Sequence, residues 1–212
     1  MDSSDHIVFI VDDDLSIRTA LTDLMASFDI HAVAFGSAEE YMAYPKPDVA
    51  ACLILDVKLP ALSGLDLQRQ MAEGDHPHIV FITGHADIPS SVRAIKAGAV
   101  DFLSKPFTQA DLMQAIRTAL AENRSARRKR AEMAGLHERL SSLTPRELQV
   151  LPLVVSGLLN KQAAAELSIT EITLQVHRGK IMKKMGAHSL AELVRMAATL
   201  QIPVTHSRHA QG

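Results

Sequence analysis

The chain has 212 residues, of which 47% are hydrophobic and 22% charged, a balance typical of globular domains that bury a core. No apolar run approaches the roughly 18 residues that a membrane-spanning helix needs, so we expect no membrane partner. The single cysteine, Cys52, excludes an internal disulfide framework. Together with an acidic N-terminus that does not resemble a signal peptide, this predicts a cytoplasmic protein.

Charge is distributed unevenly along the chain. Residues 1–120 contain 8 Lys and Arg against 17 Asp and Glu, whereas residues 121–212 contain 14 against 7. An acidic first half and a basic second half favour two domains with different partners. The basic half suits a polyanion such as nucleic acid, although a solvated basic face would have the same composition.

Short apolar runs alternate with amphipathic helical patterns over residues 1–120. Continuous apolar runs of this length are typical of parallel strands that are covered on both faces. The alternation predicts an α/β domain with a doubly wound, five-stranded parallel sheet. The expected strands are 6–11, 31–35, 51–55, 78–82 and 100–103, and the expected helices are 16–28, 38–44, 64–73, 88–97 and one that starts at 109.

A long helix is predicted from residue 109 to about residue 141, because this stretch is rich in alanine and charged residues. Residues 122–132 are too polar for a core, so residues 121–142 are predicted to be a helical linker. Apolar residues recur every seven positions, at Leu112, Ala119, Ala126, Met133 and Leu140. This spacing indicates either a helix–helix seam or an accidental pattern on a solvated connector.

Residues 143–204 show short helical patterns only, which predicts an all-α domain of four helices. Thr144-Pro145-Arg146-Glu147 has the form of a capping box, and Pro152 should kink the helix that follows. Helices expected at 160–167 and 171–185 are joined by a short turn, which is typical of a helix-turn-helix. Residues 205–212 are expected to form a disordered tail.

Acidic side chains stand at the ends of two predicted strands. Asp12 and Asp13 follow the first strand and Asp56 follows the third, so these carboxylates should converge at one edge of the sheet. Their repulsion favours a bound divalent cation, Mg²⁺ or Mn²⁺. Thr83 and Lys105 end the fourth and fifth strands and add a hydroxyl group and a cation, which completes a set suited to phosphoryl transfer onto a carboxylate.

Four motifs in order resemble those of the receiver domain in two-component response regulators of the FixJ/NarL family. They are Val11-Asp12-Asp13, the run LDVKLP that contains Asp56, the run ITGH that contains Thr83, and Lys105-Pro106-Phe107. Residues 82–107 are especially similar to the FixJ subgroup. The resemblance implies that Asp56 accepts a phosphoryl group from a partner sensor histidine kinase.

The resemblance also implies a role for the residues around Asp56. Asp13 would bind the metal directly, Asp12 through water, and Lys58 through its backbone carbonyl. Lys105 and Thr83 would contact the phosphoryl group, and Phe102 would follow Thr83 inward and reshape a surface for homodimer formation. The Lys105–Pro106 peptide bond is expected to be cis.

Residues 143–200 resemble the LuxR/FixJ-type DNA-binding domain through the runs LTPRE, GLLNKQ and VHRGKIMKKM. The third helix of this domain should bury Leu174, Ile181 and Met185 and present a basic face, including Lys184, to the major groove. His177 is expected to make a structural hydrogen bond, and Val176 either packs or contacts DNA. The expected DNA contacts are Lys161, Thr173, Gln175, Val176, Arg178, Gly179, Lys180 and Lys183.

The sequence therefore predicts a transcription regulator that binds a double-stranded DNA operator, with RNA polymerase as a further candidate partner. Enzymatic activity beyond its own phosphoryl transfer and hydrolysis is not expected. A haloacid-dehalogenase-type phosphatase would need an aspartate at the position of Lys58, so that class is excluded. Two alternatives remain, an adaptor that binds no DNA and a DNA-binding protein that ignores phosphorylation.

Overall fold

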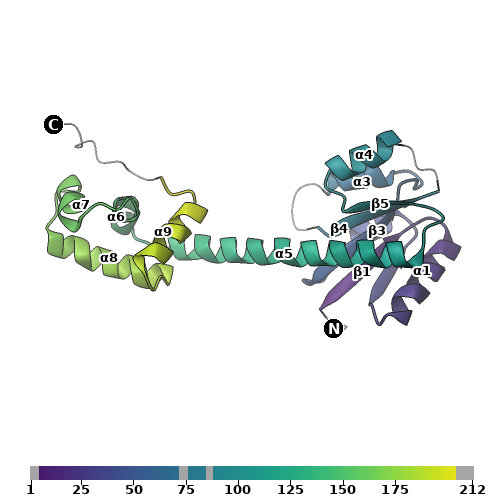
Figure 1. Cartoon of the computed structure of the whole chain (residues 1–212), viewed down its shortest axis with the longest axis horizontal. Coiled ribbons are helices and arrows are strands. Elements are labelled where there is room, and N and C mark those ends of the chain that lie inside the picture. The colour runs from purple at the N-terminus through teal and green to yellow at the C-terminus, as the bar shows by residue number, and fades with distance from the viewer. Residues whose placement is uncertain (1–4, 72–75, 85–87, 204–212) are drawn as a thin grey trace. The chain divides into compact units, whose positions relative to one another are not determined.

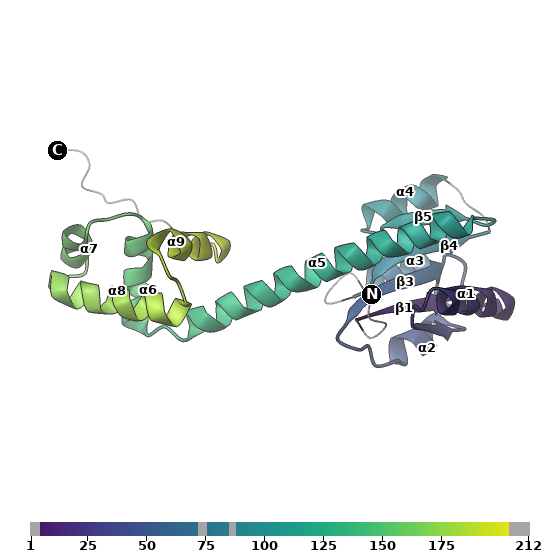
Figure 2. The same ribbon diagram turned by 60° about the horizontal axis from the view of Figure 1, so that its bottom comes forward.

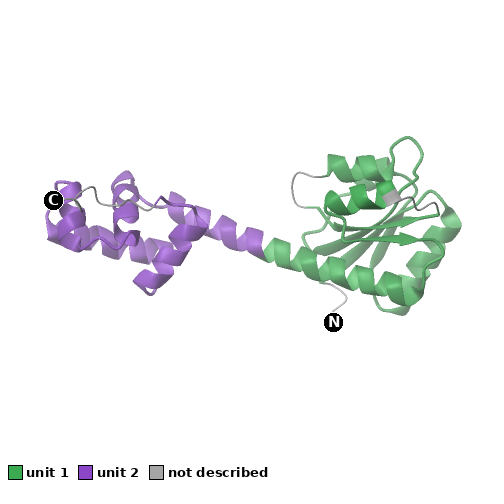
Figure 3. Ribbon diagram, turned by 45° about the horizontal axis from the view of Figure 1, so that its top comes forward, with its two compact units in different colours: residues 1–128 green, residues 129–212 purple. Residues whose placement is uncertain are grey.

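The computed structural model describes residues 5–71, 76–84 and 88–203, and the chain divides into two compact units, Met1–Arg128 and Lys129–Gly212 (Figure 3). Each unit has its own hydrophobic core. The predicted tail at residues 205–212 lies outside the described residues. Within the described part of the chain, no helix is both long and apolar enough to cross a membrane.

The first unit is built on a five-stranded parallel sheet, as the alternating pattern predicts. The strand order is β2-β1-β3-β4-β5. Each strand is followed by a helix (Figure 1). The elements are β1 (His6–Val11), α1 (Leu15–Ser27), β2 (Ala32–Phe35), α2 (Ala38–Ala43), β3 (Ala50–Asp56), α3 (Gly64–Gln70), β4 (His78–Thr83), α4 (Ile88–Lys96), β5 (Asp101–Ser104) and α5 (Gln109–Ser141).

Two hydrophobic layers cover the sheet. Because side chains alternate along a strand, Phe9 and Leu53 face one layer while Ile10 and Ile54 face the other. The first layer contains residues of α2, α3 and α4, and the second contains residues of α1 and the first part of α5 (Figure 2). Burial on both faces explains why the central strands are continuous apolar runs, and it leaves only the strand ends for polar chemistry.

The expectation that residues 122–132 are too polar for a core is wrong at one position in helix α5. Asn123 lies in this segment and is only 1% exposed. Its side chain accepts a hydrogen bond from the Ala51 amide over 3.0 Å and donates to the His76 carbonyl over 3.0 Å. This amide therefore fixes the middle of α5 to the strand β3 and to the residues before β4, and its contacts satisfy backbone groups that would otherwise be buried unpaired.

The seven-residue spacing in α5 does not form one seam. Leu112 and Ala119 are fully buried in the core of the first unit, whereas Leu140 packs against the core of the second. Ala126 and Met133 are half-buried between them. The regular spacing therefore arises in large part because two separate cores each use one end of the same helix.

The second unit contains the end of α5 and the helices α6 (Pro145–Val155), α7 (Asn160–Glu166), α8 (Glu171–Met185) and α9 (Leu190–Thr199). Thr144 and Glu147 form the predicted capping box, and Thr170 caps α8, which ends at Gly186 in the left-handed conformation. Helix α6 continues through Pro152 and buries Val150, Leu151 and Val154 around it. Helices α7 and α8 therefore pack against α6 in one hydrophobic core.

Candidate phosphoacceptor site and DNA interface

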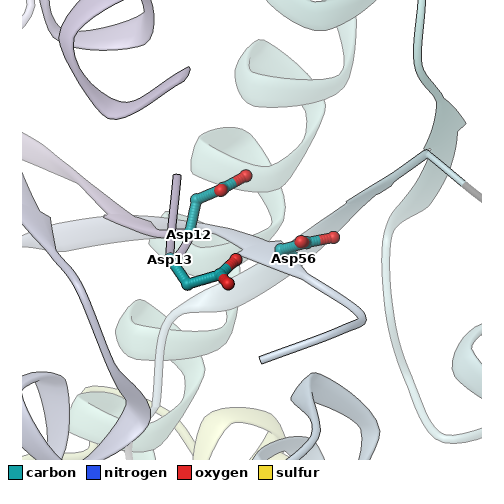
Figure 4. Close-up of side chains that lie close together, drawn as sticks. All are labelled: Asp12, Asp13 and Asp56. Carbon is teal, nitrogen blue, oxygen red and sulfur yellow. The ribbon is translucent and has the colours of Figure 1, made fainter. Parts of the chain in front are cut away.

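Three carboxylates gather where β1 and β3 end, at the carboxyl edge of the sheet (Figure 4). Asp12, Asp13 and Asp56 each offer one oxygen, and these oxygens all lie within 4.8 Å of one another. Asp12 is 1% exposed and Asp56 is 7% exposed, whereas Asp13 faces solvent. The register brings them together, since β1 and β3 are hydrogen-bonded neighbours up to Val11 and Leu55.

A cation from the last strand reaches the same cluster. The Lys105 Nζ lies 2.7 Å from Asp12 Oδ2 and 3.9 Å from Asp56 Oδ2. The Lys105–Pro106 peptide bond is cis, as predicted. Arg18 in α1 donates to the Asp12 carbonyl over 2.7 Å and so holds the backbone at the end of β1.

The surroundings of Asp56 disfavour its ionised form. Burial raises the pKa of the Asp56 carboxyl above its ordinary value, and the charge of Asp12 adds to this. Lys105 and the backbone amides of Val57 and Lys58 act in the opposite direction. The Asp56 Oδ1 atom is buried without a hydrogen-bond partner among the described residues.

The chemistry of this site suits a divalent cation. A buried carboxylate oxygen without a partner is costly, and a cation or a transferred group would satisfy it. The three carboxylates supply the hard oxygen ligands that Mg²⁺ and Mn²⁺ prefer. The residues present therefore fit such an ion.

The loop after β3 packs closely against Asp56. A Cβ atom on Gly64 would lie 2.2 Å from the Asp56 carbonyl oxygen, so only glycine fits at the start of α3. The Gly64 amide donates to the Val57 carbonyl over 3.0 Å. Lys58 lies in this loop, two residues after Asp56, with its side chain exposed. This packing holds the loop that carries Lys58 against the end of β3.

The remaining predicted receiver residues lie on the neighbouring strands. Thr83 ends β4 and is 1% exposed, and its carbonyl accepts a hydrogen bond from the Lys105 amide over 2.7 Å. Phe102 on β5 is half-buried, with its ring centroid 6.0 Å from that of Phe81. Asp14 has a different role, because its carboxylate accepts from the Ser16 amide over 2.8 Å and caps α1.

Helix α8 has the two faces that the sequence predicts. Leu174, Ile181 and Met185 are buried in the core of the second unit. Among the expected DNA contacts on this helix, those that face solvent are Gln175, Val176, Gly179, Lys180 and Lys183.

Of the three other expected DNA contacts, one is exposed and two are half-buried. Lys161 on α7 faces solvent. The Arg178 guanidinium donates to Asn160 Oδ1 over 3.1 Å and is half-buried, so it ties α8 to the start of α7. Thr173 is half-buried, and its hydroxyl lies 2.9 Å from that of Thr170, the residue that caps α8. Arg178 and Thr173 therefore each have a partner within the domain.

Two expectations for this domain are wrong. Lys184 does not join the basic face, because its ammonium lies 2.7 Å from the carboxylate of Glu147, which is almost fully buried. It also donates to the Ser142 carbonyl over 3.0 Å. The expected structural hydrogen bond of His177 is not found at Nδ1, which is buried without a partner among the described residues.

Some neighbours of the sites escaped the sequence prediction. Arg18 and Gly64 act through backbone contacts that no local pattern marks. Ile172 is 75% exposed on the outer face of α8, although its apolar side chain would be expected to be buried. Only the alignment of Ile172 with Val176, one helical turn apart, could have identified it from the sequence.

Comparisons with known proteins cover nearly the whole chain. The family described as response regulator receiver domain matches residues 8–117, and the family described as bacterial regulatory proteins, luxR family, matches residues 141–197. Nodulation protein W of Bradyrhizobium diazoefficiens is 50% identical over 99% of this chain and 92% of its own length. Response regulator protein TmoT of Ectopseudomonas mendocina is 45% identical over 95% of this chain and 92% of its own length.

A solved structure agrees with both halves of the fold. The response regulator StyR is 45% identical, has a TM-score of 0.83, and is matched over 92% of this chain and 98% of that chain. The receiver fold, the DNA-binding domain and these likenesses lead to one assignment. The chain belongs to the two-component response regulators that join a receiver domain to a LuxR-type helix-turn-helix, the FixJ/NarL family.

Proposed function

We propose that this response regulator is switched by phosphorylation of Asp56 and then binds a DNA operator as a homodimer. The observation that carries the proposal is the buried Oδ1 of Asp56, which has no hydrogen-bond partner among the described residues and lies among acidic oxygens and beside Lys105. The phosphoryl donor would be a phosphohistidine on a partner sensor histidine kinase. In this proposal the first unit accepts the phosphoryl group and the second unit binds DNA.

In this proposal Asp56 is the nucleophile of the transfer. One carboxylate oxygen of Asp56 forms a bond to phosphorus while the bond from phosphorus to the histidine nitrogen breaks, which leaves an acyl phosphate. Lys105 leaves Asp12 and pairs with the phosphoryl oxygens. Burial raises the pKa of Asp56, and the low exposure of this residue would limit the access of water to the product.

The metal in this proposal is Mg²⁺ or Mn²⁺, held by Asp12, Asp13, Asp56 and the backbone carbonyl of Lys58. When bound, it neutralises charge on the phosphoryl oxygens during transfer. Asp13 is exposed and would bind directly, whereas Asp12, already paired with Lys105, would bind through water. Loss of the metal should therefore prevent transfer even when the fold is intact.

The switch in this proposal passes from Thr83 to Phe102 and then to the surface of α4 and β5. Thr83 would donate its hydroxyl hydrogen to a phosphoryl oxygen, and Phe102 would turn inward beside Phe81. Helix α4 exposes Val92 and Ile95, which are 45% and 47% exposed. Burial of this apolar pair between two receiver domains would stabilise a homodimer.

The DNA-binding role is assigned to α7 and α8, with Lys161, Thr173, Gln175, Val176, Arg178, Gly179, Lys180 and Lys183 as the contact residues. The exposed lysines suit phosphate contacts, and Gln175 suits the edge of a base. A dimer on an inverted repeat gains a second set of such contacts. Because operator DNA lies in the cytoplasm of a bacterium, we expect the protein to act there. RNA polymerase, which binds the same DNA, is a further proposed partner.

The proposed boundaries are a receiver over residues 1–120, a helical linker over 121–142 and a DNA-binding domain over 143–204. The family matches at 8–117 and 141–197 support this division. The division between the compact units after Arg128 supports it as well.

Intact-mass spectrometry tests the phosphoacceptor. The chain is incubated with acetyl phosphate and Mg²⁺, and the expected product carries one phosphoryl group. Asp56→Asn should carry none, whereas Asp66→Asn, which changes a half-buried aspartate on α3, should be modified like the natural chain. An equal adduct on Asp56→Asn would refute the assignment.

A further inference from the structure

The outer face of α8 is apolar over its first two turns. At about 100° per residue, Ile172, Val176, Gly179 and Lys183 lie within about 40° of the direction opposite the buried stripe. Ile172 is 75% exposed and Val176 is 51% exposed. We call Ile172 and Val176 the outer ridge, and α8 is thus apolar on two opposite faces.

The residues of this face do not serve the packing of their own domain. Isoleucine and valine are poorer helix formers than alanine, and glycine is poorer still. A Cβ atom on Gly179 would meet nothing within 4 Å, and Gly179 has an ordinary helical backbone, so neither space nor conformation requires glycine. A face that weakens its helix without packing against the described residues has the form of a binding surface.

The charges around the outer ridge identify its occupant. Lys180 and Lys183 are exposed on α8, the helix that carries the outer ridge, and Lys161 is exposed on the neighbouring helix α7. An apolar protein surface would have to desolvate these lysines, whereas duplex DNA offers phosphates to pair with them. In the major groove, the one apolar group on a base edge is the C5-methyl group of thymine.

We propose that Ile172 and Val176 select thymine in the operator by contact with its C5-methyl group, and that Gly179 lets the helix backbone approach the bases. This inference rests on the proposed DNA-binding function and adds a specificity to it. Ile172 would then help to determine sequence specificity, although its side chain has neither a hydrogen-bonding group nor a charge.

The test uses the full chain activated with beryllofluoride. Duplexes are selected from a random pool, and in the enriched sequence each thymine is replaced in turn by deoxyuridine, which removes only the methyl group. Fluorescence anisotropy then gives the affinity of the natural chain, Ile172→Ala and Val176→Ala for each duplex. Val194→Ala is the matched control, because Val194 is also an exposed apolar residue but lies on α9.

The natural chain and Val194→Ala should lose about three- to fivefold in affinity at the contacted thymines, as expected for one methyl group. Ile172→Ala or Val176→Ala should bind the thymine and deoxyuridine duplexes equally at the position that each contacts. Gly179→Ala should unfold at a higher temperature yet bind at least tenfold more weakly, a combination that a purely structural glycine would not produce.

Other results would overturn the inference in distinguishable ways. Tight DNA binding with no sensitivity to any thymine methyl group would refute the outer ridge but leave the DNA-binding function intact. Absence of any enriched duplex would refute that function itself. Unchanged DNA affinity in Ile172→Ala and Val176→Ala would refute base contact and assign the face to a protein partner.

Discussion

Lys105 donates a hydrogen bond to Asp12 over 2.7 Å. Its ammonium lies 3.9 Å from Asp56, the proposed phosphoacceptor. One lysine thus neutralises the buried carboxylate of Asp12 and lies close enough to Asp56 to reach a group bound there. Under the proposed function, phosphorylation of Asp56 would draw the lysine from Asp12 to the phosphoryl group.

Replacement of Lys105 tests this arrangement. Lys105→Met should slow modification by acetyl phosphate by roughly 100-fold, because a positioned cation no longer stabilises the transferred group. The rate follows from a time course of intact mass. Lys96→Met, which alters an exposed lysine on α4, should keep the natural rate, and an equally fast Lys105→Met would contradict the role of Lys105.

Adjacent aspartates provide a matched test of the metal site. Asp13→Asn should weaken Mg²⁺ binding, measured by titration calorimetry, by at least tenfold because one charged ligand is lost. Asp14→Ala should bind Mg²⁺ as the natural chain does, since Asp14 caps α1. The same weakening in both variants would show that general acidity, and not a defined ligand set, holds the ion.

The ionised carboxylate of Asp56 should reduce the stability of the first unit. The pKa of Asp56 is raised in the folded state, so its ionised form at neutral pH is a cost that disappears as the pH falls below the folded-state pKa. Without Mg²⁺ at pH 7, Asp56→Asn should therefore unfold at a temperature about 2–4 °C higher than the natural chain. The gain should shrink when Mg²⁺ is added, and a lower unfolding temperature in Asp56→Asn would contradict the pKa direction.

The second unit should lose stability in acid through Glu147. The hydrogen bond from Lys184, with further bonds from Thr144, lowers the pKa of Glu147 from 4.5 to about 2. Because the folded-state pKa is depressed, this stabilisation is present above pH 4.5 and is lost as the pH falls toward 2.

Glu147→Gln should therefore lower the unfolding temperature by about 5 °C at pH 7 and flatten its decline between pH 4.5 and pH 2. Circular dichroism at each pH gives the unfolding temperature. The exposed Glu166 provides the control, and Glu166→Gln should retain the natural pH dependence. A decline of the same steepness in Glu147→Gln would show that other carboxylates dominate.

The fold could be predicted from sequence where local patterns carry the information. The strands are apolar runs because both faces of the sheet are buried, and Asp12, Asp56 and Lys105 mark the ends of strands where polar side chains are tolerated. Caps such as Thr144 and Thr170 depend on residues within one turn of helix, so their sequences suffice.

Contacts between distant segments could not be predicted in this way. Asn123 lies in a polar stretch, yet it is buried because its amide pairs with backbone groups of β3 and of the residues before β4, 72 and 47 positions away. Lys184 resembles Lys180 and Lys183 in sequence, but its ammonium pairs with the buried carboxylate of Glu147, 37 positions earlier. In both cases the partner, not the local pattern, decides burial.

We propose above all that phosphorylation of Asp56 controls DNA binding through dimer formation. The most direct measurement titrates the enriched operator duplex with the full chain, with and without beryllofluoride, and determines the mass of the protein by light scattering in the same samples. We expect beryllofluoride to raise both the dimer fraction and the operator affinity, the latter by roughly 100-fold or more, because the second half-site contact becomes intramolecular. Asp56→Ala should not respond. A beryllofluoride-treated chain that stays monomeric and binds the operator no better than the untreated chain would contradict the claim.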